Sequence, residues 1–441
     1  MPTRLGLAPL TALATLALLS APGPAVAARA TTPTGPDLPA RTTPAKPGTP
    51  MAARGTLSEG ALRDEISDAL RSVSGADGAW VFDVDAGREL FADDATRRFV
   101  PASNQKLFTT AAFLDHFGAD TRLKTRVYAS GRVRGGARRL TVAGDLVIVG
   151  DGDPAFGTAS FARDNAQPVT KVSTIARAVA AAGVRRITGR VLADDTIFDR
   201  KRRAGPYLSP LSGLSFNNGI AGGGYASDPE LVAAKQLARA LRKRGVRVSK
   251  RVGRAKLAPR ALEQQPLAMA PSPPVSTLIA ETNEASNNFF AEMLLKRLGA
   301  EGGRGTRSRG ADKVERFARR EGADVNAVDG SGLSRSNAAS PQEVGRLLVA
   351  VARDETDAAA FARSLATAGR EGTLADRMEG TAAEGACAGK TGTLDGVSAL
   401  SGYCETGGHT IAFATLFNDT NVDAARDVQD RIAVAVARYA P

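Results

Sequence analysis

Apolar residues recur every three or four positions near both ends of this chain of 441 residues, which is the spacing of a helix with one buried face. The repeats consist of Leu62, Ile66, Leu70 and Val73 near the start, and of Ala425, Val428, Ile432, Val436 and Tyr439 near the end. We therefore expect an amphipathic helix at each end of the folded part of the chain.

Strand patterns lie between these two helices. Residues 80–84 and the residues around Leu90 form two apolar runs separated by Asp85-Ala86-Gly87, which predicts a hairpin. Residues 410–417 predict another strand, and a second hairpin is expected over 387–404 for reasons given below. The order of helix, hairpin, hairpin, strand and helix favours an antiparallel sheet flanked by helices.

The middle of the chain has a different pattern. Short β-rich pieces alternate there with helical runs, which indicates a smaller inserted α/β subdomain over residues 123–264. The strand pieces are 140–142, 145–149 and 191–192, and the helical runs are 172–182 and 229–244. Residues 56–122 and 265–441 then form one domain of the α/β class (layered α+β), with helical sequence at 275–298 and a capping-box pattern at 340–343.

The N-terminal segment has the pattern of an export signal. Arg4 supplies a positive charge, residues 5–19 are apolar, and Ala25-Val26-Ala27 is a cleavage pattern, so 1–27 is predicted to be a signal peptide. A membrane anchor is the alternative, but the apolar run is short. Residues 28–55 are rich in Pro and Thr, which predicts a disordered spacer. We expect an extracytoplasmic bacterial protein, secreted or wall-associated, with no transmembrane anchor after cleavage; peripheral association with wall or membrane stays open.

Positive charge is concentrated in one stretch. The chain has a net charge of +12, and eleven Lys or Arg occur between Lys235 and Arg260 without an acidic residue. Such a run in a cytosolic protein indicates nucleic-acid binding, which the export signal argues against. A solvated helix face is the simpler interpretation, and attraction to anionic wall polymers is the weaker alternative.

Two cysteines and two distant histidines, His116 and His409, offer no metal-ligand cluster, so we expect neither a metal nor a cofactor.

The two cysteines flank a predicted hairpin. Asp395-Gly396 is typical of a two-residue type I′ turn, which needs positive φ at both residues. Counting outward from this turn places Cys387 opposite Cys404 in a non-hydrogen-bonded pair, where the Cα atoms approach closely. Because disulfides persist outside the cytoplasm, we predict a Cys387–Cys404 disulfide, with two free buried thiols as the alternative.

Three short motifs carry residues suited to nucleophilic catalysis. In Ser103-Asn104-Gln105-Lys106, positions i and i+3 share a helix face, so Lys106 can take the proton of the Ser103 hydroxyl. Ser286-Asn287-Asn288 and Lys390-Thr391-Gly392-Thr393 follow, the latter on the first strand of the hairpin. Taken singly, each motif has a simpler structural interpretation: a solvated helix, a turn or cap, and a strand guarded by lysine.

Taken together and in this order, the motifs resemble the Ser-x-x-Lys, Ser-x-Asn and Lys-Thr-Gly set of penicillin-recognising enzymes. Longer segments are similar to class C low-molecular-mass penicillin-binding proteins, the D-Ala-D-Ala carboxypeptidase/endopeptidase family. These segments are Pro101 to Thr110, Gly152-Asp153-Pro154, Asp194 to Phe198, Tyr207 to Asn217, Asp329 to Arg335 and Gly380 to Tyr403. The resemblance covers about residues 57–440 and implies the penicillin-binding/β-lactamase-like transpeptidase fold. The middle motif has Asn287 where many relatives have Asp, and the stretch before it is shorter than in larger members.

The resemblance also implies a mechanism. Ser103 attacks the carbonyl between two D-alanines of a peptidoglycan stem peptide and forms an acyl-enzyme. Lys106 is the implied base, and the charge of Lys390 is expected to lower its pKa. Ser286 relays a proton to the leaving amine, and Asn288 orients the substrate and Lys106.

The remaining implied site residues bind the substrate. Lys390 and Thr391 hold its terminal carboxylate, and Gly392 marks a position where something approaches the backbone closely. The N–H groups of Ser103 and Thr393 form the oxyanion hole. β-Lactam antibiotics are the implied covalent inhibitors.

Several alternatives stay open. Asp194 matches a family position near the pocket for the substrate side chain, and a structural role is its alternative. A β-lactamase or esterase on the same fold, or a non-catalytic peptidoglycan-binding protein, fits the same motifs. A His-based triad is less favoured, because neither histidine lies in a recognisable nucleophile context.

Overall fold

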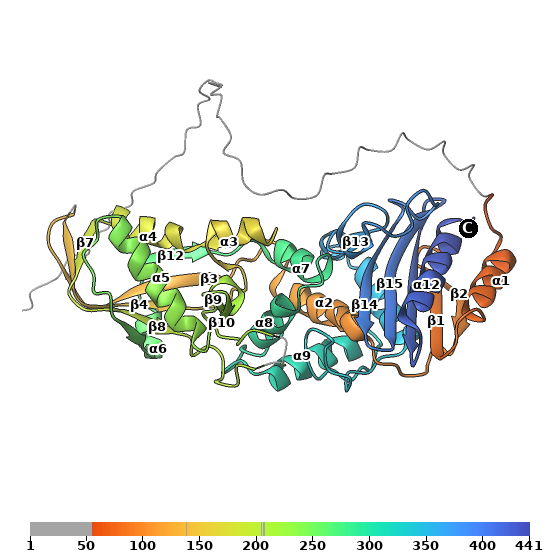
Figure 1. Ribbon diagram of the computed structural model, residues 1–441, viewed down its shortest axis with the longest axis horizontal. Helices are drawn as coiled ribbons and strands as arrows, with labels where there is room; N and C mark the ends of the chain where they lie inside the picture. Colours follow the sequence, from red (N-terminus) through yellow and green to blue (C-terminus); the bar gives the residue numbers. More distant parts are fainter. Residues whose placement is uncertain (1–54, 138, 204, 206–207) are drawn as a thin grey trace, which may run out of the picture. The chain divides into compact units, whose positions relative to one another are not determined.

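The computed structural model describes residues 55–441 except 138, 204 and 206–207 (Figure 1). The expected signal peptide (1–27), nearly all of the expected spacer (28–55) and Tyr207 lie outside the described residues. Over the described part of the chain, no helix has both the length and the apolar character needed to cross a membrane.

A six-stranded antiparallel sheet is built from both ends of the chain, as the order of the elements predicted. Its strand order is β13-β14-β15-β16-β1-β2, and β1 pairs with β16 over its whole length. The strands are β1 (Ala76–Asp83), β2 (Arg88–Asp93), β13 (Ala366–Thr367), β14 (Cys387–Leu394), β15 (Val397–Thr406) and β16 (His409–Asn418). N- and C-terminal segments therefore depend on each other for this sheet.

Helices cover the two faces of this sheet (Figure 1). The predicted terminal helices, α1 (Glu59–Leu70) and α12 (Val422–Ala437), pack on one face, in a cluster that includes Val81. Trp80 belongs to the cluster on the other face, because successive side chains of a strand point to opposite sides. The helices in that cluster are α2 (Gln105–Phe117), α7 (Val275–Asn283), α8 (Asn288–Leu298), α9 (Arg307–Arg320), α10 (Pro341–Ala352) and α11 (Ala358–Ala362).

The expected helical run over 275–298 is broken into α7 and α8. Ser286 lies between them with a φ of +55°, in the left-handed region that interrupts a right-handed helix. Asn287 begins the second helix, because its side chain accepts a hydrogen bond from the N–H of Phe290. The predicted capping box at the start of α10 is present, with both hydrogen bonds between Ser340 and Glu343.

The inserted segment forms a second, mixed sheet with strand order β11-β8-β4-β3-β12, and β7 pairs with β4. Its strands are β3 (Lys124–Arg134), β4 (Leu140–Val149), β7 (Val184–Ile187), β8 (Val191–Asp194), β11 (Val252–Arg254) and β12 (Ala268–Pro271). Helices α4 (Val172–Ala181) and α5 (Pro229–Lys243) pack on one face of it. β12 lies after residue 264, the expected end of the insertion, so the sheet takes in residues up to Pro271.

Short elements complete the chain. They are β5 (Phe156–Gly157), β6 (Thr170–Lys171), β9 (Ile220–Ala221), β10 (Gly224–Tyr225), α3 (Ala159–Asp164), α6 (Pro259–Leu262) and the 3₁₀ turns η1 (Ala102–Asn104), η2 (Asn217–Gly219) and η3 (Gly372–Leu374).

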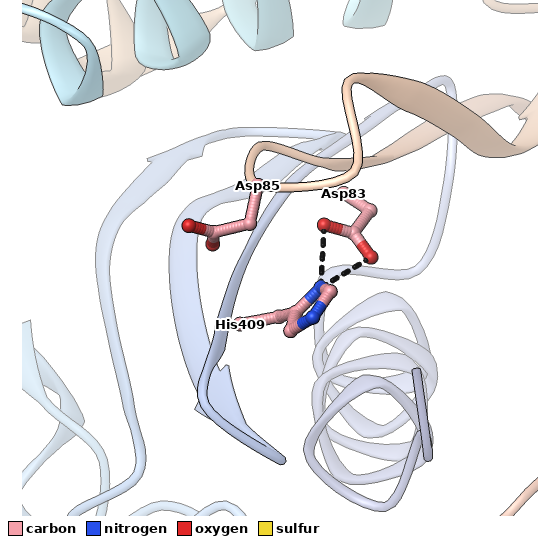
Figure 2. A group of neighbouring side chains, drawn as sticks. All are labelled: Asp83, Asp85 and His409. Carbon is pink, nitrogen blue, oxygen red and sulfur yellow. Dashed lines mark hydrogen bonds and ion pairs between the residues drawn. The ribbon is translucent and has the colours of Figure 1, made fainter.

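One histidine lies among carboxylates at the joined ends of β1 and β16. Asp83, Asp85 and His409 each offer one atom of a type that can bind a metal ion, and these three atoms lie within 4.8 Å of one another. Figure 2 shows the His409 ring facing Asp83, whose two carboxylate oxygens lie 3.0 and 2.9 Å from Nδ1. Asp85 accepts a hydrogen bond from the N–H of Thr410 at 2.7 Å. These bonds tie the two strand ends together, a contact that the sequence did not indicate because the residues are far apart along the chain.

Candidate active site

Ser103 lies in the 3₁₀ turn η1, which leads directly into α2. The side chain of Asn104 donates a hydrogen bond to the Ser401 hydroxyl on β15 at 2.7 Å, which fastens this turn to the sheet. Lys106, three residues after Ser103, is fully buried, and its Nζ donates to the partly exposed Ser103 hydroxyl at 2.8 Å. The predicted i, i+3 relationship therefore brings the two groups into direct contact.

Two further acceptors fix the orientation of the Lys106 amine. Nζ donates to Oδ1 of Asn288 at 2.7 Å and to the carbonyl oxygen of Ser331 at 2.7 Å. A carbonyl oxygen can only accept, so these two bonds use two N–H groups whatever the charge of the lysine. The third hydrogen-bonding position of Lys106 Nζ faces the Ser103 hydroxyl. In the charged form Nζ donates a hydrogen bond there, and in the neutral form its lone pair accepts one from the hydroxyl. This geometry suits Lys106 to act as a base.

Burial is the main cause of the unusual acidity of Lys106. It lowers the pKa of Lys106 to about 7, and the carboxylates of Asp329 and Glu292 act in the opposite direction. Burial also lowers the pKa of Lys390 well below its usual range, and the charge of Lys106 lowers it further. We expected the charge of Lys390 to lower the pKa of Lys106; instead, removal from water is what disfavours the charged form of Lys106.

The third motif lies on β14, in the expected hairpin. Its register pairs Leu394 with Val397 and Cys387 with Cys404, as predicted. Of the two turn residues only Gly396 has a positive φ (66°), so the turn is not the expected type I′. In the observed turn only the second central residue has a positive φ, and glycine occupies that position. Asp395 is therefore spared the backbone strain that a positive φ imposes on a residue with a side chain.

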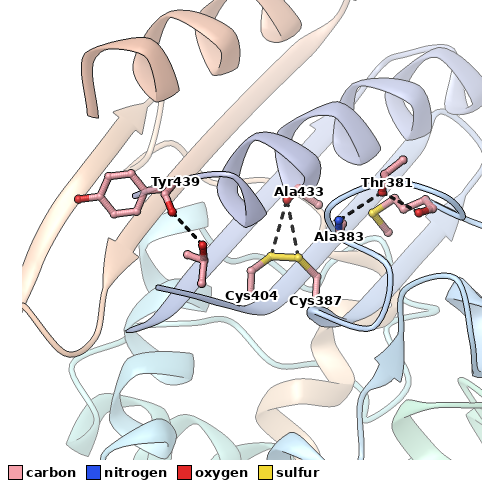
Figure 3. The surroundings of a disulfide bond; sticks show 8 residues. Thr381, Ala383, Cys387, Cys404, Ala433 and Tyr439 are labelled. Atoms are coloured by element: carbon pink, nitrogen blue, oxygen red, sulfur yellow. Dashed lines mark hydrogen bonds between the residues drawn. A yellow bond between two sulfur atoms is a disulfide. The ribbon is translucent and has the colours of Figure 1, made fainter. Parts of the chain in front are cut away.

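A disulfide joins Cys387 to Cys404, whose Cα atoms are 4.0 Å apart (Figure 3). Both sulfur atoms lie 3.7 Å from the carbonyl oxygen of Ala433 in α12. The bridge therefore links the two strands beneath a helix, three residues before Lys390.

Gly392 allows β14 to pack against the turn that carries Ser103. A Cβ atom at Gly392 would stand 2.9 Å from the Pro101 carbonyl oxygen and 3.2 Å from the Cβ of Ala102. Sequence reasoning expected a close approach at this glycine, and the approaching group is the turn of the same chain that carries Ser103. Lys390 is buried in the same strand, and its Nζ donates to the carbonyl oxygen of Thr391 at 2.8 Å.

The other predicted residues on this side of the site have neighbours that sequence reasoning missed. The Thr391 hydroxyl donates to the Thr373 hydroxyl at 2.8 Å, and the exposed Thr393 hydroxyl accepts a hydrogen bond from Arg426 at 3.3 Å. In the part of the chain that the structure describes, no hydrogen bond joins the Ser286 hydroxyl to Ser103, Lys106 or Lys390. The local sequence around Thr373 and Arg426 contains no motif that could have indicated them.

Two buried acidic residues, Glu292 and Asp329, hold the loop whose Ser331 carbonyl oxygen accepts a hydrogen bond from Lys106. Glu292, one turn after Asn288 on α8, accepts hydrogen bonds from the N–H groups of Gly330 and Ser331 and from the Ser331 hydroxyl. Asp329 accepts three more from the same loop, and its donors are Gly332 N–H, Ser334 N–H and the side chain of Asn337. Both segments were noted in the sequence, but without a role.

Asp194 is engaged within the inserted sheet. One carboxylate oxygen accepts from the N–H and hydroxyl of Thr196 at 3.0 and 2.6 Å, and the other accepts from the N–H of Leu257 at 2.7 Å. Both oxygens of this buried side chain thus have partners in its own subdomain, which favours the structural role over contact with substrate.

The chain has relatives of known name. It matches the model of the D-Ala-D-Ala carboxypeptidase 3 (S13) family over residues 60–221 and 224–439. It is 32% identical to a D-alanyl-D-alanine carboxypeptidase of Actinomadura sp. (strain R39), over an alignment of 489 positions that covers 90% of this chain and 88% of that protein. It is 28% identical to the carboxypeptidase DacB of Mycolicibacterium smegmatis (strain ATCC 700084 / mc(2)155), with 77% and 75% covered.

Solved structures share the fold at lower sequence identity. Penicillin binding protein 4 from Haemophilus influenzae matches with a TM-score of 0.68 at 19% identity, covering 83% of this chain and 97% of that one. A predatory peptidoglycan endopeptidase from Bdellovibrio bacteriovorus matches with a TM-score of 0.52 at 18% identity, covering 80% and 88%. The expected fold class is thereby confirmed, and the chain belongs to the D-Ala-D-Ala carboxypeptidase 3 (S13) family.

Proposed function

We propose that this serine-type carboxypeptidase hydrolyses the bond between the two D-alanines of peptidoglycan stem peptides, with Ser103 as the nucleophile. The observation that carries the proposal is the 2.8 Å contact between the Ser103 hydroxyl and a buried lysine whose other hydrogen bonds are already taken. On cross-linked peptides the same reaction makes the protein an endopeptidase.

Acylation needs the neutral form of Lys106. The amine takes the hydroxyl proton while Ser103 Oγ bonds to the carbonyl carbon, and the bond to the leaving D-alanine nitrogen then breaks. That nitrogen receives a proton that returns from Lys106, and Ser286 lies between α7 and α8 as the proposed relay. Because the pKa of Lys106 is about 7, the lysine is neutral in a large fraction of molecules at physiological pH.

Lys390 and Thr391 are the proposed partners of the substrate's terminal carboxylate. Burial lowers the pKa of Lys390 well below its usual range, and an arriving carboxylate favours the charged form of this lysine. The N–H groups of Ser103 and Thr393 are the proposed oxyanion hole, where one donor contributes about 3 kcal/mol to transition-state stabilisation.

Water then releases the product from Ser103. β-Lactams are expected to acylate the same hydroxyl, a proposal supported by a β-lactam complex of the Haemophilus influenzae protein. A substrate of this kind places the enzyme outside the cytoplasm, at the cell wall.

Intact-mass measurement of the protein after incubation with a labelled penicillin tests this assignment. We expect a stable one-to-one adduct that is lost in Ser103→Ala and kept in Ser74→Ala, which removes an exposed hydroxyl. Rapid loss of the adduct with hydrolysis of the drug would support the β-lactamase alternative. Absence of an adduct in folded protein would support the non-catalytic alternative.

A further inference from the structure

Charge is unevenly divided between the segments of the chain that form the two large sheets. Residues 124–271, which span the second sheet, contain 27 Lys and Arg and 10 Asp and Glu, a net charge of +17. Residues 55–123 and 272–441 contain 26 Lys and Arg and 35 Asp and Glu, a net charge of −9. The net charge of +12 for the whole chain is therefore the sum of opposite contributions. Residues 124–271 form a cationic module, and residues 55–123 and 272–441 form an anionic part that carries the proposed catalytic site.

Part of this charge forms a row across neighbouring strands. Arg134 of β3 pairs with Thr141 of β4, Thr141 pairs with Arg186 of β7, and Arg186 forms a bridge with Arg247. Residues paired across a sheet share a face, and Arg132, two positions before Arg134, lies on that face too. Three strand spacings separate Arg134 from Arg247, which is about 14 Å. Figure 1 shows β3, β4 and β7 together at one end of this sheet.

This arginine row (Arg132, Arg134, Arg186 and Arg247) points away from the core. The alternate residues Val142, Ile187 and Val246 are buried in the cluster beneath α4 and α5. All four arginines are exposed, so the row faces solvent on the side of the sheet opposite those helices.

The row has no neutralising partner among the residues that the structure describes. Arginines of the inserted segment that form ion pairs are Arg126, Arg202 and Arg254. Within the described residues, no carboxylate lies at ion-pair distance from a member of the row. Like charges side by side on a sheet are destabilising, so a bound anion relieves a repulsion that the folded protein carries.

We propose that the arginine row binds a linear phosphodiester polymer of the cell wall and holds the enzyme beside its substrate. Guanidinium groups pair with phosphate through two parallel hydrogen bonds, and a row about 14 Å long matches several phosphates of an extended chain rather than one ion. An anionic membrane is the less suitable partner, because the row offers no exposed large apolar side chain to insert: Val133 pairs with the buried Val142 and so lies on the other face of the sheet.

A second cationic stripe provides a matched control. Lys235, Arg239 and Lys243 are exposed at every fourth position of α5, on the opposite layer of the module. Replacing either set of three by Glu changes the net charge equally, so a difference between the two variants reports position rather than total charge.

The test is binding of the purified protein to poly(glycerol phosphate), followed by fluorescence anisotropy at several salt concentrations. For R134E/R186E/R247E we expect affinity to fall about tenfold or more, with the slope of log K against log salt reduced by about 2. For K235E/R239E/K243E we expect a change of about threefold or less at moderate salt. Thermal unfolding checks that both variants fold. If R134E/R186E/R247E does not fold, the variant with Gln at the same three positions replaces it.

Equal losses in the two variants would overturn the proposal in favour of attraction by net charge alone. Tighter binding of the wild type to phosphatidylglycerol vesicles or duplex DNA than to the polymer, at equal phosphate concentration, would also overturn it. None of these readouts uses the catalytic reaction, so they stand whatever the outcome at Ser103.

Discussion

The carboxylate of Glu292 accepts two hydrogen bonds from Ser331, one from its N–H at 2.9 Å and one from its hydroxyl at 2.7 Å. The carbonyl oxygen of the same serine accepts a hydrogen bond from Nζ of Lys106 at 2.7 Å. Glu292 therefore holds the proposed base in place through Ser331, in addition to raising the pKa of Lys106 by its charge. This makes it a positioning residue.

Glu292→Ala removes the acceptor of three buried donors. An unsatisfied buried donor costs about 1–3 kcal/mol, so we expect the free energy of unfolding to fall by about 3 kcal/mol or more. We also expect penicillin acylation to slow, because the Ser331 carbonyl no longer holds Lys106 in place. Glu292→Gln keeps the oxygen acceptor and should retain an acylation rate within about tenfold of wild type. Equal damage in both variants would contradict the positioning role.

The same glutamate predicts a pH dependence of stability. Burial, with the charge of Asp329, raises the pKa of Glu292 to about 7 from 4.5. Between these values the unfolded chain loses the proton while the folded protein keeps it, so the free energy of unfolding falls as the pH rises. Urea unfolding of wild type and Glu292→Gln from pH 4.5 to 7.5 measures this, and the decline should be smaller in the variant. Parallel curves would refute the shifted pKa.

Acylation should follow the deprotonation of Lys106. Its neutral form is the proposed base and its pKa is about 7, so the rate of reaction with penicillin should rise through about pH 7 and then level off. In Lys106→Arg the side chain stays charged, and we expect a loss of about 10³-fold at every pH. Stopped-flow acylation from pH 5.5 to 9 checks both statements, and a flat wild-type profile would exclude Lys106 as the base.

Local patterns account for the parts of this structure that could be predicted. The periodic apolar residues of α1 and α12 and the capping box of α10 are short-range signals, and each appears as expected. The register of β14 and β15 was predictable because a two-residue turn leaves one pairing for every residue that follows it. The i, i+3 pair of Ser103 and Lys106 belongs to the same class.

The supporting contacts could not be predicted because they join distant segments. Glu292 and Ser331 are 39 residues apart, and Asp83 and His409 are 326 apart. No periodicity connects such pairs until the helices and the sheet are packed. Burial as the main cause of the lowered pKa of Lys106 was missed for a related reason. The motifs alone suggested a nearby charge at Lys390, but how deeply Lys106 is buried depends on the whole fold.

Gly332 should be intolerant of a side chain because of the proposed nucleophile turn. A Cβ atom there would lie 1.8 Å from the carbonyl oxygen of Ala102, and the residue has a φ of +84°. Gly380 has a φ of +67° with no atom within 4 Å of its added Cβ, so Gly380→Ala isolates the backbone cost of about 1–2 kcal/mol. Gly332→Ala should be more destabilising and should slow acylation about tenfold or more, because the backbone of η1 must move. Similar acylation rates in the two variants would contradict this.

The Cys387–Cys404 disulfide should contribute to stability more than to catalysis. It closes a loop with a sequence separation of 17, and a bridge over a loop of that size stabilises a protein by about 3 kcal/mol. Lys390 is held in β14 by the ladder to β15 and by burial as well, so its position does not depend on the bridge alone. In C387A/C404A we therefore expect a lower melting temperature and a penicillin acylation rate within about threefold of wild type at 25 °C. Adding dithiothreitol should lower the melting temperature of wild type toward that of the variant and leave the variant unchanged. A large loss of acylation in a variant that is still folded at 25 °C would show instead that the bridge holds the substrate-binding strand in place.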